Sequence, residues 1–136
     1  MTGSRRKARI IALQTLYELD AVARQTEAVV ARLLAEAGLS EENNAFVREL
    51  VDGVIQHKDE IDGHIRKFAP AWPLEQIAMV DRNILRLAIF EVLFDNKVPV
   101  KVAISEAVEL AKSFGSEHSS KFVNGVLGSV SALASR

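Results

Sequence analysis

Apolar residues recur along most of the chain at steps of three and four positions, the spacing that lines up one face of an α-helix. Prolines and glycines interrupt this pattern and mark where helices are expected to end: Gly38, Pro70, Pro99 and Gly115. The pattern predicts helices over residues 4–23, 26–37, 40–55, 61–68, 73–93, 103–114 and 119–130. No stretch alternates as a strand would, and no repeat of fixed period occurs.

The segment between Pro73 and Leu93 is the most hydrophobic, and it leaves little polar face. A helix that is apolar all round belongs at the centre of a bundle, and proline suits the first turn of a helix. Thr26 and Ser40 are suited to cap the second and third helices. We therefore predict a compact all-α domain of about seven helices, a single domain over residues 1–136.

Composition narrows the class of protein. Hydrophobic residues make up 49% of the chain, which supports a real core, but no apolar run approaches the ~18 residues of a membrane-spanning helix. The chain has no cysteine, which excludes disulfides, thiolate metal sites and cysteine catalysis within it. A reducing compartment fits this composition, and we expect a cytoplasmic protein.

Positive charge is concentrated at the start of the first predicted helix, at Arg5, Arg6, Lys7 and Arg9. The rest of the chain carries more acidic than basic residues. A helix N-terminus disfavours cations, by about 0.3–1 kcal/mol each when exposed, and no acidic residue precedes Glu18. One interpretation is that an external anion such as phosphate completes the site. The alternative is a solvated, frayed terminus.

A search for catalytic chemistry finds little. The chain has no nucleophile elbow, no glycine-rich nucleotide loop and no P-loop lysine. His57 and His64 lie near acidic residues, but their spacing matches no zinc pattern, so we expect no metal. Glu106 and Glu109 share a helix face beside lysines, which favours a solvated ion-pairing surface over acid–base catalysis. We expect no enzyme, no cofactor and no small-molecule substrate.

Two groups of residues remain open to structural or binding roles. Arg82 and Arg86 interrupt the apolar central helix, and they require either carboxylate partners inside the fold or a ligand at an open face. Lys121 and Phe122 lie near the start of the last predicted helix, where phosphate or an unstacked base could bind. Phe122 also has core spacing with Val126, so spacing alone favours the core for Phe122.

Four segments of the chain resemble the NusB family of bacterial transcription antitermination factors. These segments are R-R-K-A-R-x-x-A-L-Q-x-L-Y at 5–17, V-D-R-N-I-L-R-L-A-x-x-E at 80–91, V-P-x-K-V-A-I-S-E-A-V-E-L-A-K-S-F at 98–114 and K-F-V-N-G-V-L at 121–127. The resemblance implies two packed helical bundles. It also implies that the chain pairs with the ribosomal protein NusE, binds single-stranded boxA RNA of ribosomal RNA transcripts, and joins the RNA polymerase elongation complex to suppress premature termination.

The resemblance also implies roles for particular residues. Arg5, Arg6, Lys7 and Arg9 fall on the family's arginine-rich RNA-binding segment. Lys121 and Phe122 fall on positions near the RNA, which favours exposure of Phe122 over the core position that spacing alone favours. Asp81 falls on an acidic position near the partner protein or the RNA.

Three positions depart from the family pattern: Ser105 for the usual Asn, Gly128 for a common Asp, and His118 for a frequent acid. An acid lost beside RNA removes a repulsion, so we expect RNA affinity to rise rather than fall. Two other classes stay open. A NusB-like domain of a ribosomal RNA methyltransferase would need a cofactor-binding domain and a catalytic cysteine, and a helical module could bind protein only.

Overall fold

The computed structural model describes residues 3–134, which form α-helices and two short helices with no strand among them. The elements are α1 (Gly3–Ala21), α2 (Thr26–Ala37), α3 (Glu41–Gln56), α4 (Lys58–Phe68), η1 (Leu74–Gln76), α5 (Met79–Ile89), η2 (Phe90–Asp95), α6 (Val100–Phe114) and α7 (Ser119–Ser131). Their number and order confirm the prediction of an all-α fold of about seven helices. None of the helices within residues 3–134 combines the length and apolar content needed to cross a bilayer.

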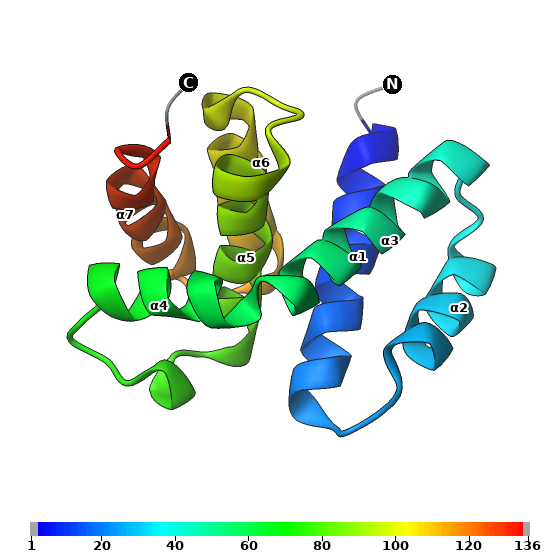
Figure 1. The fold of residues 1–136 in the computed structure, drawn as a ribbon, viewed down its shortest axis with the longest axis horizontal. Coiled ribbons are helices and arrows are strands. Elements are labelled where there is room, and N and C mark those ends of the chain that lie inside the picture. The colour runs from blue at the N-terminus through cyan, green and yellow to red at the C-terminus, as the bar shows by residue number, and fades with distance from the viewer. Residues whose placement is uncertain (1–2, 135–136) are drawn as a thin grey trace.

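The helices form two groups, and α5 of the second group packs against the first. Figure 1 shows α1, α2 and α3 on one side of the molecule and α4, α5, α6 and α7 on the other. Helix α5 packs against α6, α7 and α4 of its own group and against α1 of the other. The two packed bundles expected from the family resemblance are therefore present.

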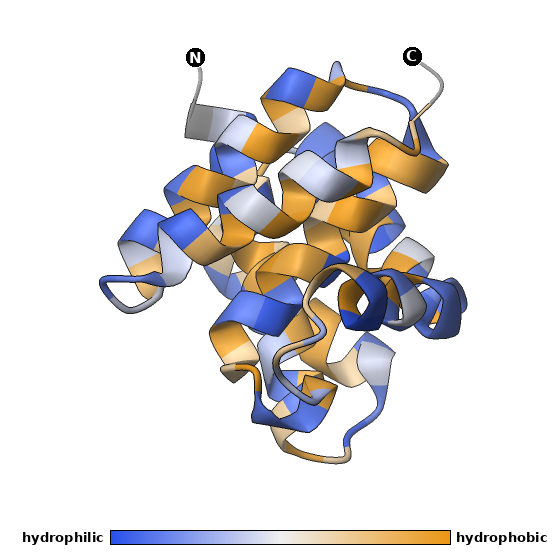
Figure 2. Cartoon of the chain, turned by 90° about the vertical axis from the view of Figure 1, so that its left-hand side faces the viewer, coloured by the Kyte–Doolittle hydropathy of each residue, from blue (hydrophilic) through white to orange (hydrophobic). Residues whose placement is uncertain are grey.

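Helix α5 lies at the centre of the core, as its apolar sequence predicts. Ile84, Leu85, Leu87 and Ile89 are each at most 1% exposed. In the view of Figure 2, apolar segments gather along the inner sides of the helices while polar segments lie on outer turns and loops. Gly53 of α3 lets the core close, because a Cβ there would lie 2.1 Å from the Phe90 ring.

The predicted helix over 73–93 is wrong in extent, since it is divided into three elements. After η1 the backbone of Ile77 and Ala78 is extended, with ψ of 133° and 136°, so α5 begins only at Met79. The Arg82 guanidinium spans this break by donating hydrogen bonds of 3.3–3.4 Å to the carbonyls of Leu74 and Glu75 in η1 and of Ile77 after it. At its other end α5 continues into the π-helix η2, which Asn96 ends with a φ of 59°.

Two of the predicted helix boundaries are confirmed, and one predicted cap is wrong. The Ser40 hydroxyl accepts a 3.1 Å hydrogen bond from the Asn43 amide at the start of α3. Gly38 ends α2 in the left-handed conformation, with a φ of 67°. Thr26, expected as a cap, lies inside α2, and Gln25 at the cap position makes no side-chain capping bond.

Candidate nucleic-acid interface

Arg5 and Arg6 are exposed near the start of α1, and each is held by polar groups of another helix. The Arg5 guanidinium lies 4.0 Å over the Phe46 ring and donates to Asn43 at 3.1 Å and Glu42 at 3.4 Å. Arg6 donates two hydrogen bonds to the Glu106 carboxylate of α6, of 3.1 and 2.8 Å. These hydrogen bonds, more than the opposing desolvation, lower the pKa of Glu106. Carboxylates from other helices thus offset the cations that the sequence left unbalanced.

Lys7 completes the exposed part of this cluster. Within residues 3–134 it forms no ion pair with a carboxylate. We call Arg5, Arg6 and Lys7 the N-terminal cationic cluster. Its side chains present positive charge at one end of α1, where free backbone N–H groups also suit an anion.

Arg9 does not belong to this exposed cluster, contrary to the expectation of a surface contact. Its side chain is 5% exposed, and it donates hydrogen bonds of 2.9 and 2.8 Å to the equally buried Glu91. Burial lowers the pKa of Arg9, but the hydrogen bonds and charge of Glu91 outweigh it, and the pKa is raised overall. Arg9 lies three and four positions before the buried Ala12 and Leu13, so helical geometry places it on the inner face of α1.

A cavity of about 290 Å³ brings Asp81 and Phe122 together, with Trp72 and His118 also in its wall. We call it the Trp72 cavity. Asp81 is only 8% exposed, and its Oδ1 atom accepts no hydrogen bond in the described part of the chain. Phe122 is half-buried, because it packs against the core and also lines the cavity. Neither the core interpretation nor the exposed one describes it fully.

Lys121 is exposed on α7 and lines a different hollow from its neighbour Phe122. The three positions that depart from the family pattern are all on the surface: Ser105, His118 and Gly128. His118 lies 3.2 Å from the Glu117 carboxylate. A histidine in the wall of the Trp72 cavity brings no fixed negative charge there.

Arg82 and Arg86 have the structural role rather than the ligand role. Arg86 donates to Asp62 at 2.8 and 3.1 Å and to Asp20 at 3.0 Å, and Arg82 donates to Asp20 at 2.7 and 3.0 Å. Burial raises the pKa of Asp20, but hydrogen bonds from Arg82 and Asn83 and the Arg86 charge outweigh it, so the pKa falls to about 2. This network joins α1 to α4 and α5.

Among the histidines of residues 3–134, His57 has a packing contact. The His57 ring stacks on Phe94 with centroids 4.2 Å apart. Between residues 3 and 134, no three acidic or histidine side chains gather in a way that could hold a metal ion.

Sequence reasoning missed two kinds of surface residue. Trp72 is 57% exposed in the wall of its cavity, although its segment was interpreted only as a helix break. Lys101 and Lys112 line the same groove as Lys121, although their charge suggested only pairing with neighbouring acids. For Trp72 the available sequence signal was a tryptophan between two prolines. No sequence signal connected Lys101 and Lys112 with Lys121.

Comparison with known proteins identifies the family. The family model described as the NusB family matches residues 6–132. The chain belongs to the NusB family. A transcription antitermination protein NusB of Dehalococcoides mccartyi is 58% identical over 135 residues, which is 98% of this chain and 94% of that protein. The NusB of Roseiflexus sp. is 51% identical over 132 residues, covering 96% and 93%.

Solved structures of NusB proteins agree with the fold. T. maritima NusB matches with a TM-score of 0.90 at 31% identity, covering 97% of this chain and 93% of that one. A crystal structure of antitermination factors NusB and NusE in complex with double-stranded RNA contains a chain that matches with a TM-score of 0.89 at 28% identity. That match covers 98% of this chain and 99% of the other.

Proposed function

We propose that this NusB protein binds single-stranded boxA-type RNA together with a NusE-type partner and thereby acts with the RNA polymerase elongation complex in transcription antitermination. The observation that carries the proposal is the exposed N-terminal cationic cluster on a chain that is otherwise more acidic than basic. Such an asymmetry localises a polyanion at one end of the molecule. The solved NusB–NusE complex, whose RNA is double-stranded, supports RNA and a NusE-type protein as partners.

The proposed RNA contacts are Arg5, Arg6, Lys7, Lys121 and Phe122. Arg6 is held on Glu106 of α6, and α6 packs against α7, which carries the other two residues. We leave Arg9 out of the proposed direct contacts, because its guanidinium is buried on Glu91. Its part is to fix α1 against η2, so that the cluster projects from a rigid support.

Replacing Arg5, Arg6 and Lys7 with alanine tests the proposal. Losing about three phosphate contacts is expected to lower the slope of log affinity against log salt by up to ~2. Fluorescence anisotropy with a labelled single-stranded boxA RNA, repeated at several salt concentrations, measures it. The matched control removes Lys58, Arg66 and Lys67, three exposed cations of α4. Equal slopes for wild type and both variants would refute the proposal, and a duplex of the same sequence shows whether single strands are preferred.

Phe122→Ala is expected to affect both stability and RNA binding. The ring is half-buried, so the loss should be about 2 kcal/mol of unfolding free energy rather than the larger cost of a core phenylalanine. Base stacking adds an expected loss of about 1–3 kcal/mol in RNA binding. Urea denaturation and RNA titration of one sample measure both, with Phe114→Ala, an exposed ring of α6, as control. Normal RNA affinity in the folded variant would assign Phe122 to packing alone.

Asp81 is the proposed partner contact, because it lines the Trp72 cavity and its Oδ1 accepts no hydrogen bond within residues 3–134. A NusE-type partner is expected to tighten RNA binding, and Asp81→Asn should reduce that tightening by about tenfold, the size of one charge-assisted hydrogen bond. RNA titrations with and without partner at one salt concentration measure the ratio. Asp59→Asn on exposed α4 is the control. An unchanged ratio in Asp81→Asn would remove this residue from the interface.

A further inference from the structure

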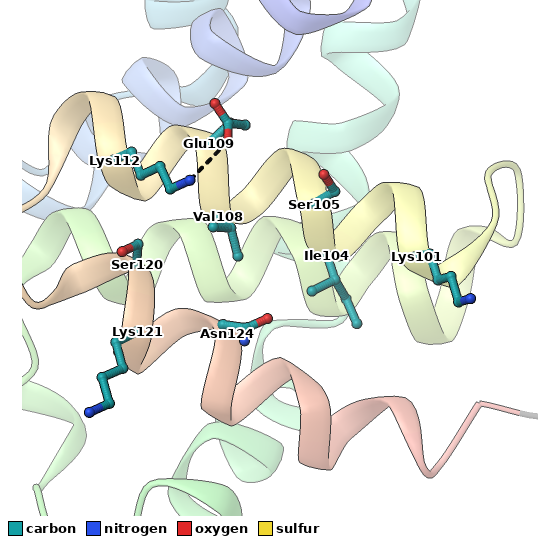
Figure 3. A pocket seen from close by; sticks show the side chains of 9 residues that line it. All are labelled: Lys101, Ile104, Ser105, Val108, Glu109, Lys112, Ser120, Lys121 and Asn124. Carbon is teal, nitrogen blue, oxygen red and sulfur yellow. Dashed lines mark hydrogen bonds and ion pairs between the residues drawn. The ribbon is translucent and has the colours of Figure 1, made fainter.

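A groove of about 560 Å³ lies between α6 and α7, and three lysines line it (Figure 3). Lys101 and Lys112 lie near opposite ends of α6, and Lys121 projects from α7. The two α6 lysines are separated by about three helical turns, or about 17 Å along the axis. The positive groups are thus spread along the groove rather than gathered at one point.

The charge of the groove is not neutralised from within. Glu109 is the acidic residue in its wall, and the Lys112 ammonium lies 3.4 Å from the Glu109 carboxylate. In residues 3–134 neither Lys101 nor Lys121 forms an ion pair with a carboxylate. The lining therefore keeps an excess of two positive charges that face solvent.

The remaining lining is typical of a backbone-binding surface rather than a base-reading one. Ser120 and Asn124 of α7 offer uncharged hydrogen-bond donors beside the lysines, and Ile104 and Val108 supply an apolar wall. Among residues 3–134 no aromatic side chain lines the groove, so this part of the chain gives it no platform on which a base could stack. Lysine ammonium groups act as point charges toward phosphate and carry no sequence information.

The groove is connected to the N-terminal cationic cluster through α6. Arg6 is held on Glu106, and Glu109, one turn further along α6, lies in the groove wall. The charge of Glu109 also reaches Arg6, since it contributes to the raised pKa of that residue after the larger effect of Glu106. One strand of RNA that meets Arg6 can therefore continue onto α6 and α7.

We propose that the α6–α7 groove binds the sugar-phosphate backbone of single-stranded RNA, with Lys101 and Lys112 as phosphate contacts in addition to Lys121. The proposal rests on the RNA binding proposed above and extends it to a second, sequence-independent segment of the strand. Glu109 opposes this binding, because its carboxylate holds Lys112 and repels phosphate. Affinity in the groove is thus set by the balance between Lys112 and Glu109.

The test compares two opposite changes in the full chain. Lys101→Ala with Lys112→Ala should lower the salt slope by up to ~1.4, and equally for oligouridine and for a mixed-sequence RNA. Glu109→Gln should instead bind both RNAs several-fold more tightly, a gain that misfolding cannot produce. A control variant with Lys58→Ala and Lys67→Ala in α4 should keep the wild-type salt slope. A second control, Lys101→Arg with Lys112→Arg, preserves the charge of the groove and should keep that slope as well.

The outcomes separate this inference from the function on which it rests. If the Arg5, Arg6 and Lys7 variant loses salt dependence while the groove variants match wild type, the groove inference fails and the proposed function stands. If wild type does not bind the boxA RNA of the earlier test, the proposed function itself fails. A poly-glutamate peptide that binds more tightly than RNA, and loses affinity in the same lysine variant, would show that the groove takes an acidic protein segment instead.

Discussion

Arg9→Met is expected to lower the free energy of unfolding by about 3–5 kcal/mol, because it leaves the buried Glu91 carboxylate without its guanidinium partner. The two side chains are 5% and 3% exposed, so water cannot replace the lost hydrogen bonds. Urea denaturation followed by circular dichroism at 222 nm measures the change. Where the variant is folded, its RNA salt slope should equal that of wild type, since the buried Arg9 is not among the proposed RNA contacts.

A second change distinguishes a broken ion pair from lost packing. Arg9→Met combined with Glu91→Leu removes both charges, so it should recover most of the loss. Arg5→Met, in an exposed pair with Glu42, should cost less than about 1 kcal/mol. If the double variant were as unstable as Arg9→Met alone, the charge argument would be wrong. A reduced salt slope in Arg9→Met would return Arg9 to the RNA surface.

The fold was largely predictable because helical periodicity is a local signal. The buried positions of α3 and the cap at Ser40 follow from sequence neighbours alone. The division of the 73–93 segment was not predictable in this way. It lies in the extended backbone of Ile77 and Ala78, which Arg82 spans with hydrogen bonds and which apolar spacing does not reveal.

The sequence predicted which residue types form the candidate site, but not which of their side chains are exposed to solvent. Four clustered cations pointed to an anion, yet the sequence could not show that Glu91 lies beside Arg9, because the two are 82 positions apart. The same limit applies to the α6–α7 groove, whose lysines come together only when α7 packs on α6. The distribution of charge along the chain indicates a polyanionic partner, while burial decides which charged side chains are able to contact it.

In helix α1 the N-terminal cationic cluster and the core residues lie on different parts of the helix, so the cluster can be changed without disturbing the core. Ile11 and Leu13 pack in or against the core, while Arg5 and Arg6 reach α3 and α6 through exposed polar contacts. Arg5 also lies over the Phe46 ring. Exposed contacts of this kind contribute about 0–1 kcal/mol each. RNA phosphate can therefore compete for these guanidinium groups at small cost, whereas Arg9 stays on Glu91.

Stability is expected to fall as the pH drops from about 4 to 2, because the Asp20 carboxylate has a pKa of about 2 in the folded protein and an ordinary value of 3.8 when unfolded. A depressed carboxylate pKa gives stability that is fully present above the unfolded value and is lost on protonation in the folded state. The contribution is up to about 2.5 kcal/mol at neutral pH. Urea midpoints measured at several pH values between 2 and 7 follow it.

The Asp20→Asn variant tests whether Asp20, rather than the other acidic residues that titrate in the same pH range, causes the loss of stability. The amide cannot carry the charge that Arg82 and Arg86 require, so the variant should be less stable by about 2–3 kcal/mol at pH 7. Its stability should also change less than that of wild type between pH 4 and 2, since the group with the lowered pKa is gone. Asp59→Asn, on exposed α4, should leave the pH profile unaltered. If the stability of wild type and of Asp20→Asn fell in parallel between pH 4 and 2, protonation of Asp20 would not be the cause of the loss at low pH.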